Sequence, residues 1–152
     1  MSSVREGVAA RQKTGWNLHP PYHLGIASEV LECAGEYESA AAALAEAEMA
    51  IDTSNERWWE AEIHRLKGVL LLSQGDVAQS ESCFERSIRI ARQQQASSLE
   101  LRAATSLARL WGEQGRRAEA RDLLAPVYDW FTEGFDTPDL KDARALLDAL
   151  NA

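Results

Sequence analysis

The sequence has few residues that interrupt a helix and no long apolar run. Only 4 of its 152 residues are proline, the residue least compatible with a helix interior. β-Branched residues are sparse, whereas the helix-favouring Ala, Leu, Glu, Arg and Gln dominate. No apolar stretch approaches the ~18 residues that a membrane-spanning helix needs. These features predict an all-α protein that does not span a membrane.

Positive charge and cysteine are also scarce. A net charge of −8 disfavours binding to nucleic-acid phosphates or to an anionic membrane surface, so we expect neither as a partner. The two cysteines, Cys33 and Cys83, lie far apart without a pairing context, and we expect both to be ordinary, partly buried residues. The opening "MSSVREGVAARQK" lacks the apolar core of a secretory signal. We therefore expect a cytoplasmic protein.

The sequence contains no motif that indicates catalysis, a metal or a cofactor. No glycine-rich segment is followed by Lys-Ser or Lys-Thr, as in a phosphate-binding loop. His19, His23 and His64 are not at zinc-ligand spacing, and a structural or surface role fits them better. The acidic residues of "DTPDLKD" lack the glycine and terminal glutamate of a calcium loop and fit helix capping better. We predict a non-enzymatic chain with no cofactor.

An internal repeat organises the chain. "AGEYESA", "QGDVAQS" and "QGRRAEA" begin at residues 34, 74 and 114, so their glycines, Gly35, Gly75 and Gly115, are 40 residues apart. Five further columns share this spacing. Three hold small or modest side chains and two hold large apolar ones: Ser28, Gly68, Ala108; Ala40, Ser80, Ala120; Ala47, Ser87, Val127; Leu31, Leu71, Trp111; and Leu44, Phe84, Leu124. Six columns in one register predict a true repeat.

Each repeat is predicted to form two helices around its glycine. Apolar residues recur at three- and four-residue steps on both sides of the glycine, which can end the first helix in a left-handed conformation. Small side chains would let the two helices pack closely. The predicted helices cover residues 3–14, 20–34 with 37–53, 57–74 with 77–95, 98–114 with 117–133, and 138–150. Thr137 is the expected N-cap of the last helix, with Pro138 at its first position.

A single domain of stacked pairs follows, because one helix pair cannot bury its apolar face alone. We expect an N-terminal helix in 1–16, repeats in 17–56, 57–96 and 97–136, and a capping helix in 137–152. The capping helix has an apolar side made of Leu140, Ala143, Leu146, Leu147 and Leu150.

These columns resemble the tetratricopeptide repeat (TPR) family across roughly residues 17–134. The family pattern has a small eighth residue, a large eleventh, Gly at fifteen, Ala at twenty, Leu or an aromatic at twenty-four and Ala at twenty-seven. It is met with first positions at Pro21, Ala61 and Leu101. The resemblance implies an α-α superhelix (solenoid) of three helical hairpins. The chain departs from the family in its longer period, against about 34 residues. It also departs in the missing proline at position thirty-two and in its fourth-position residues, Leu24, His64 and Ala104, where tryptophan is usual.

A narrower resemblance starts at "ERWWEAEIHRLKGVLLLSQGD" and continues through "LELRAATSLARLWGEQGRRAEARDLLAPVYDWF" into the last helix. These segments are similar to the C-terminal TPR tail of bacterial signalling proteins that join a class III adenylate/guanylate cyclase domain to a predicted regulatory ATPase. The resemblance implies a sensor or scaffold end of such a protein, without its catalysis.

In the resembled fold, the first helix of each repeat lines a concave groove. The residues that map onto it are Tyr22, Gly25, Glu29, Glu32, Cys33; Glu62, Arg65, Val69, Leu72, Ser73; and Arg102, Thr105, Arg109, Gly112, Glu113. One interpretation is a groove whose Arg65, Arg102 and Arg109 hold a carboxylate or an acidic peptide. The other is a solvated face with ion pairs, such as Arg65 with Glu62.

Aromatic residues add a second candidate surface. Trp58 and Trp59 are adjacent at a predicted helix start, where neighbours point about 100° apart, so we expect one to pack and the other to be an exposed partner anchor. Trp111 belongs to a large apolar column and is expected in the core. We expect Tyr128, Trp130 and Phe131 to pack against the final helix.

Together these features predict a non-catalytic scaffold that binds a peptide or a partner domain in its groove, an acidic peptide being one candidate. Two alternatives stay open. The chain could be a structural module that forms homo-oligomers through an open apolar end. It could also be the regulatory fragment of a nucleotide cyclase or ATPase polypeptide.

Overall fold

The computed structural model describes residues 20–152, and its regular elements there are all helices. They are α2 (Pro20–Cys33), α3 (Tyr37–Ser54), α4 (Glu60–Ser73), α5 (Val77–Gln93), α6 (Ser97–Glu113), α7 (Arg117–Asp129) and α8 (Pro138–Asn151). The described part of the chain contains no strand. The all-α prediction is therefore confirmed, while the predicted helix over 3–14 lies outside the described residues.

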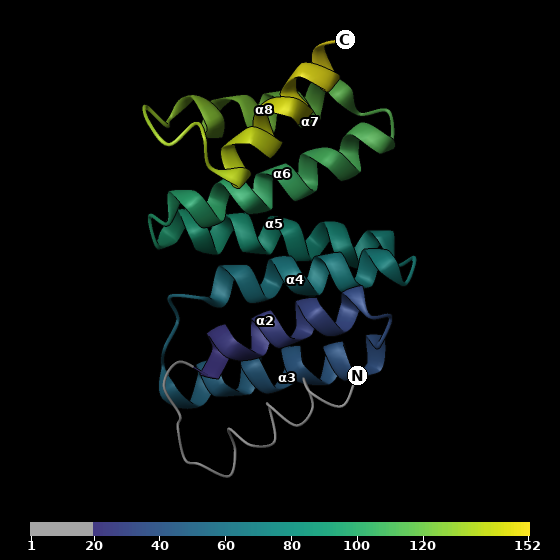
Figure 1. Cartoon of the computed structure of the whole chain (residues 1–152), viewed down its shortest axis with the longest axis vertical. Helices are drawn as coiled ribbons and strands as arrows, with labels where there is room; N and C mark the ends of the chain where they lie inside the picture. The colour runs from purple at the N-terminus through teal and green to yellow at the C-terminus, as the bar shows by residue number, and fades with distance from the viewer. Residues whose placement is uncertain (1–19) are drawn as a thin grey trace.

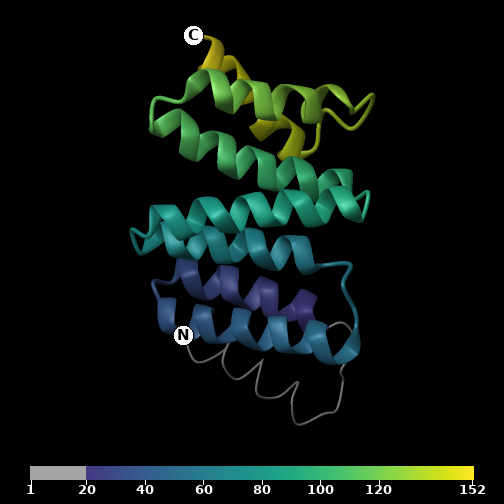
Figure 2. The ribbon, with the colours of Figure 1, turned by 180° about the vertical axis from the view of Figure 1, so that it is seen from behind.

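The helices pack as successive pairs along the long axis of the molecule (Figure 1). α2 packs with α3, α4 with α5, and α6 with α7, and each pair contacts the next. The first helices also touch one another, since α2 contacts α4 and α4 contacts α6. α8 continues this series by packing on both α6 and α7. The view from behind shows the same succession (Figure 2).

A glycine in the left-handed region closes each hairpin. Gly35, Gly75 and Gly115 have φ values of 76°, 85° and 81°. In the middle hairpin, the N–H of Gly75 bonds the carbonyl of Leu72 at 2.9 Å, and the N–H of Asp76 bonds that of Leu71 at 2.9 Å. These two bonds form a Schellman motif, which satisfies carbonyls left free at a helix end. The predicted role of the repeated glycines is confirmed.

Small side chains lie where the two helices of a pair meet, as predicted. Ala40, Ser80 and Ala120 are all fully buried. In the middle pair, the hydroxyl of Ser80 donates to the carbonyl of Gly68 at 2.8 Å, and that of Ser87 donates to the carbonyl of Ala61 at 2.6 Å. A larger side chain in this column would therefore displace a neighbouring backbone as well as fill space.

Two predicted helix boundaries are wrong by several residues. α4 begins at Glu60 and not at residue 57, because Arg57 to Trp59 form a turn in which the N–H of Glu60 bonds the carbonyl of Arg57. α7 ends at Asp129 and not at residue 133. Pro126 lies inside α7 and has no N–H to donate, which weakens its last turns.

Three side-chain predictions need correction. Trp130 does not pack against α8, because 67% of it is exposed. Trp111 is only partly buried, and its indole N–H donates to Glu81 at 2.6 Å. Cys33 is exposed and not partly buried. Thr137 is the N-cap residue of α8, as predicted, although its hydroxyl donates to the carbonyl of Gly134 and does not bond to the helix.

Tyr128 and Phe131 do pack against the cluster that contains the buried residues of α8.

Across residues 20–152, no helix combines the length and apolarity required to cross a membrane.

Candidate functional site: the groove face

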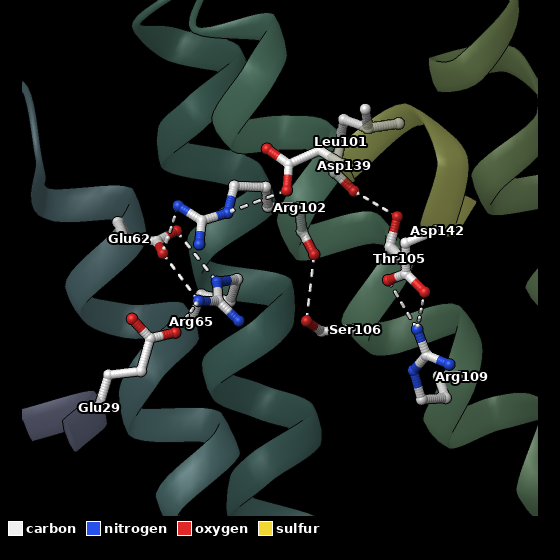
Figure 3. Close-up of polar contacts among 10 residues, drawn as sticks. All are labelled: Glu29, Glu62, Arg65, Leu101, Arg102, Thr105, Ser106, Arg109, Asp139 and Asp142. Atoms are coloured by element: carbon white, nitrogen blue, oxygen red, sulfur yellow. Dashed lines mark hydrogen bonds and ion pairs between the residues drawn. The ribbon is translucent and has the colours of Figure 1, made fainter. Parts of the chain in front are cut away.

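Five of the residues predicted to line a groove meet around one pocket, to which α8 adds two acids: Glu29, Arg65, Arg102, Thr105 and Arg109, with Asp139 and Asp142. We call this surface the groove face. Figure 3 shows its charged core. A pocket of about 150 Å³ lies among the polar side chains of four helices: Glu29, Arg65, Arg102, Thr105, Ser106, Arg109, Asp139 and Asp142.

A buried carboxylate lies at the centre of the groove face. Glu62 is only 2% exposed. Arg65 donates to both of its oxygens, from Nε at 3.0 Å and from Nη2 at 2.8 Å. Arg102, from the next helix pair, places Nη1 2.8 Å from Oε1 of Glu62. Two guanidinium groups thus compensate the desolvation of this carboxylate, which would otherwise cost several kcal/mol.

The same contacts affect Arg65. Burial alone would lower the pKa of Arg65, but its hydrogen bonds and its charge attraction to Glu62 raise that pKa above the usual value. Arg65 is therefore held in its charged form, and it neutralises a carboxylate within the chain.

Two exposed acids extend the ion pairs to both sides. Nη2 of Arg65 is 3.5 Å from Oε1 of Glu29 on α2, and Nε of Arg102 is 3.8 Å from Oδ1 of Asp139 on α8. The result is a chain of alternating charges, Glu29–Arg65–Glu62–Arg102–Asp139, that crosses α2, α4, α6 and α8 (Figure 3). Only one of its four contacts lies within a single helix.

Arg109 forms a separate pair with α8. Its Nη2 donates to both carboxylate oxygens of Asp142 at 2.8 Å. Its Nε and Nη1 make no hydrogen bond to residues 20–152, and about half of the side chain is exposed. Of the three predicted groove arginines, Arg109 has the most capacity left for a partner.

These contacts bear on the two interpretations drawn from the sequence. Arg65, Arg102 and Arg109 all form ion pairs, and they do so mainly between helices, whereas the sequence suggested pairing within one helix. A carboxylate from a partner would have to compete with the half-exposed Glu29, Asp139 or Asp142. The groove face therefore carries both charges.

Some predicted groove residues are partly or fully buried. Val69 and Leu72 are partly buried and pack against the larger hydrophobic core. Gly25 is buried beside α4, where an added Cβ would lie 3.1 Å from Cδ1 of Ile63. Thr105 is buried and donates its hydroxyl to the carbonyl of Leu101 at 2.7 Å. These residues support the groove face by packing beneath it, and they present few polar groups to a partner.

The sequence reasoning missed Asp139, Asp142 and Ser106 as parts of this face. The repeat register offered a signal for one of them, because Asp142 is 40 residues after Arg102 and therefore occupies the same column. Extending the register into the last helix would have indicated that α8 contributes to the face. Asp139 and Ser106 had no such signal.

Aromatic rings lie at the α2–α4 end of the structure. Trp58 is 46% exposed and stacks on Tyr22, with ring centroids 5.9 Å apart. Trp59 is partly buried, packs against the core around α2 and α3, and contacts Tyr22 edge-on at 5.1 Å. The prediction that one tryptophan packs and the other is exposed is confirmed.

Other titratable groups do not assemble into a site. His64 is buried on α4, with Nδ1 3.9 Å from Oε1 of Glu48. Within residues 20–152, no three His, Cys, Asp or Glu side chains are grouped so that they could hold a metal ion.

The chain matches no protein-family model, and comparisons with curated proteins and with solved structures likewise find no match. Its function must therefore be inferred from its own residues.

Proposed function

We propose that the chain is a non-catalytic interaction module, an α-α superhelix of three TPR-like hairpins capped by α8, that binds a peptide or partner domain on its groove face. The observation that carries this proposal is the pocket of about 150 Å³ to which α2, α4, α6 and α8 all contribute polar side chains. A ligand that lies across this pocket would contact successive helices at once, which favours an extended peptide.

The charges suggest how such a peptide would lie. Glu29 on α2 is half-exposed and suits a basic group, whereas Arg109 on α6 has unused donors that suit an acidic one. Trp58 offers an exposed aromatic surface at the α2–α4 end. An acidic peptide would bind through the Arg109 end, since Arg65 and Arg102 already hold Glu62.

The test uses a peptide selected from a random library for binding to the wild-type chain. We expect Glu29→Lys or Arg109→Glu to weaken binding by about tenfold or more, because each reverses a charge without removing a partner of Glu62. Arg144→Glu is the matched control, since Arg144 is exposed on α8 and pairs only with Asp148 among the ion pairs of residues 20–152. Equal binding to all three variants would rule out the groove face.

A second candidate function is oligomerisation through the α2 end. Ile26 and Val30 on α2 are 42% and 45% exposed. Their counterparts 40 residues later, Leu66 and Leu70, are only 6% and 4% exposed, because α4 packs on the preceding α2–α3 pair. Ile26 and Val30 therefore occupy positions that a preceding helix pair covers in the next repeat. A second copy of the chain could stack there.

Light scattering separates this alternative from the first. If copies stack through α2, the wild-type mass should rise with concentration, and Ile26→Lys with Val30→Lys should abolish the rise. Met49→Lys is the control, because Met49 is an exposed apolar residue on α3. A monomer at every concentration would exclude stacking.

The resemblance to cyclase-linked signalling proteins adds a context. In that context the module would be the cytoplasmic regulatory tail of a longer bacterial polypeptide with cyclase or ATPase domains. The intact mass of the native polypeptide tests this directly, since a mass equal to that of the 152 residues would exclude a linked catalytic domain.

A further inference from the structure

A second hollow lies on the other side of α6 from the groove face. It has a volume of about 440 Å³ and lies among α5, α6 and α7. On α6 it is lined by Leu107 and Trp111, which are each two residues from a groove-face residue. Two helical residues span about 200°, so these side chains point away from the groove face. The hollow is thus spatially separate from the pocket described above.

The hollow has an apolar floor and a rim with two arginines and one acid. Ile88, Leu107, Trp111 and Leu123 supply its apolar lining, and Arg89, Arg92 and Glu85 lie beside them on α5. Ile88 and Leu107 belong to the buried core, while Trp111 and Leu123 are partly exposed. An apolar group that enters here would contact side chains already fixed by the core, which lowers the entropic cost of binding.

The repeat register explains why the hollow exists here. At the equivalent place one repeat earlier, Lys67 on α4 reaches Glu48 on α3, with Nζ 2.9 Å from Oε1. Forty residues later these two positions are Leu107 and Ile88. An ion pair between long side chains is thus replaced by two shorter apolar residues. At this repeat, no ion pair like that of Lys67 and Glu48 joins α5 and α6 at these two positions.

The arginines around the hollow differ from those of the groove face. Among residues 20–152, Arg89 and Arg86 form no ion pair, whereas Arg65, Arg102 and Arg109 all do. Of the lining residues, Arg92 pairs with Glu100 at 2.7 Å, which leaves Arg89 as the unpaired positive charge beside the acid Glu85. Arg86 is its neighbour one turn earlier on α5.

We infer that this hollow binds an acidic amphipathic segment of a partner protein. An apolar side chain of the segment occupies the hollow, and carboxylates beside it pair with Arg89 and Arg86. The apolar floor favours a protein segment over a nucleic acid, which offers little comparable apolar surface, and the chain's net negative charge opposes a long polyanion. This surface would function whether or not the groove face binds a partner.

The test uses synthetic helical peptides of ~15 residues with leucines along one face and glutamates on the other. Binding is measured by fluorescence anisotropy of the labelled peptides. The comparison peptides replace every leucine by serine, or every glutamate by lysine. We expect the acidic leucine peptides to bind and both comparison sets to fail, with affinity falling as salt concentration rises.

Variants locate the contact. Arg89→Glu should weaken binding by about tenfold or more, because it reverses the unpaired positive charge of the rim. Leu123→Gln should weaken binding by altering the floor, with thermal unfolding used to check that it still folds. Arg144→Glu, at an exposed arginine on α8 outside both surfaces, is the matched control and should bind as wild type does.

Four results would overturn the inference. These are failure of all acidic leucine peptides to bind, equal binding by the lysine set, equal binding to Arg89→Glu, and displacement of the peptide by a DNA oligonucleotide of equal charge. The last would assign the surface to nucleic acid. A loss of peptide binding with Arg89→Glu but not Arg109→Glu would distinguish this hollow from the groove face.

Discussion

Gln95 adopts a backbone conformation that suits glycine better. The turn after α5 repeats the bonding of the hairpin turns, with the N–H of Gln95 on the carbonyl of Arg92 and that of Ala96 on the carbonyl of Ala91. Its φ is 54°, in the left-handed region where a side chain costs roughly 1–2 kcal/mol. Glycine lowers this cost but loses more chain entropy on folding. We therefore predict that Gln95→Gly raises the free energy of unfolding by about 1 kcal/mol, measured by urea denaturation.

Gly75→Ala tests the reverse change, because it adds a side chain at a left-handed position instead of removing one. Gly75 has a φ of 85°, and no atom lies within 4 Å of the position its Cβ would take. Its substitution should therefore lower the free energy of unfolding through backbone strain alone, by about 1 kcal/mol. If both variants shifted stability in the same direction, left-handed strain would not be the cause.

His64 should make folding sensitive to mild acid. Burial, followed by the positive charge of Arg86, holds the pKa of His64 below its model-peptide value of 6.5. Lys67 acts in the same direction, whereas Glu48 and Glu60 oppose the shift. The unfolded chain therefore binds a proton more readily than the folded one. The free energy of unfolding should fall as the pH drops from about 6.5 through the lowered pKa of the folded state.

The variant His64→Gln isolates this effect. It removes the titrating group, so the difference in stability between wild type and variant should depend on pH only within that window. Urea denaturation at about pH 7.5 and about pH 5.5 provides the comparison. A difference that stays constant between the two conditions would show that His64 does not titrate on unfolding.

At the scale of helices, Gly68 and Phe84 form a tight contact between α4 and α5. A Cβ added to Gly68 would lie 2.6 Å from Cε1 of Phe84, too close for an unstrained contact. The equivalent pairs in the other repeats are Ser28 with Leu44 and Ala108 with Leu124. A larger first residue therefore occurs with a smaller second one.

This pairing predicts a strong coupling between two substitutions. Gly68→Ala should lower the free energy of unfolding by about 1–2 kcal/mol, because the clash outweighs the gain in helix propensity. In a chain that already carries Phe84→Leu, the same Gly68→Ala substitution should lower the free energy of unfolding by much less. A double-mutant cycle in urea measures the coupling. Additive losses would mean that the two side chains do not determine how closely these helices pack.

Much of the helical arrangement could be predicted because it depends on local pattern. The hairpin glycines and the small and apolar columns recur every 40 residues, so each copy supports the interpretation of the others. One of the errors lies where that register stops. Trp130 follows the end of α7, and its exposure depends on how the chain turns towards α8.

The candidate site was less predictable, because its charges are decided by contacts between helices. Sequence reasoning named Arg102 and Arg109, but their partners Asp139 and Asp142 come from α8, more than thirty residues further along the chain. The burial of Glu62 likewise requires Arg102 from the next pair. Such long-range pairing cannot be read from the spacing within one helix.

For the molecule as a whole, the two sides of α6 present arginine differently. On the groove face, arginines form ion pairs that join α2, α4, α6 and α8. Beside the hollow on the other side, Arg89 and its neighbour Arg86 form no ion pair within residues 20–152. The first arrangement suits a ligand of mixed charge that lies across several helices, and the second suits an acidic one.

The central proposal is that a partner binds across the first helices. The most direct test is a map of backbone amide NMR shifts on adding a peptide selected from a random library against the wild-type chain. The proposal predicts that the largest changes lie on α2, α4 and α6 around Glu29, Arg65 and Arg109, and that they vanish in Arg109→Glu. Changes confined to α3, α5 and α7, with the groove face unaffected, would contradict it.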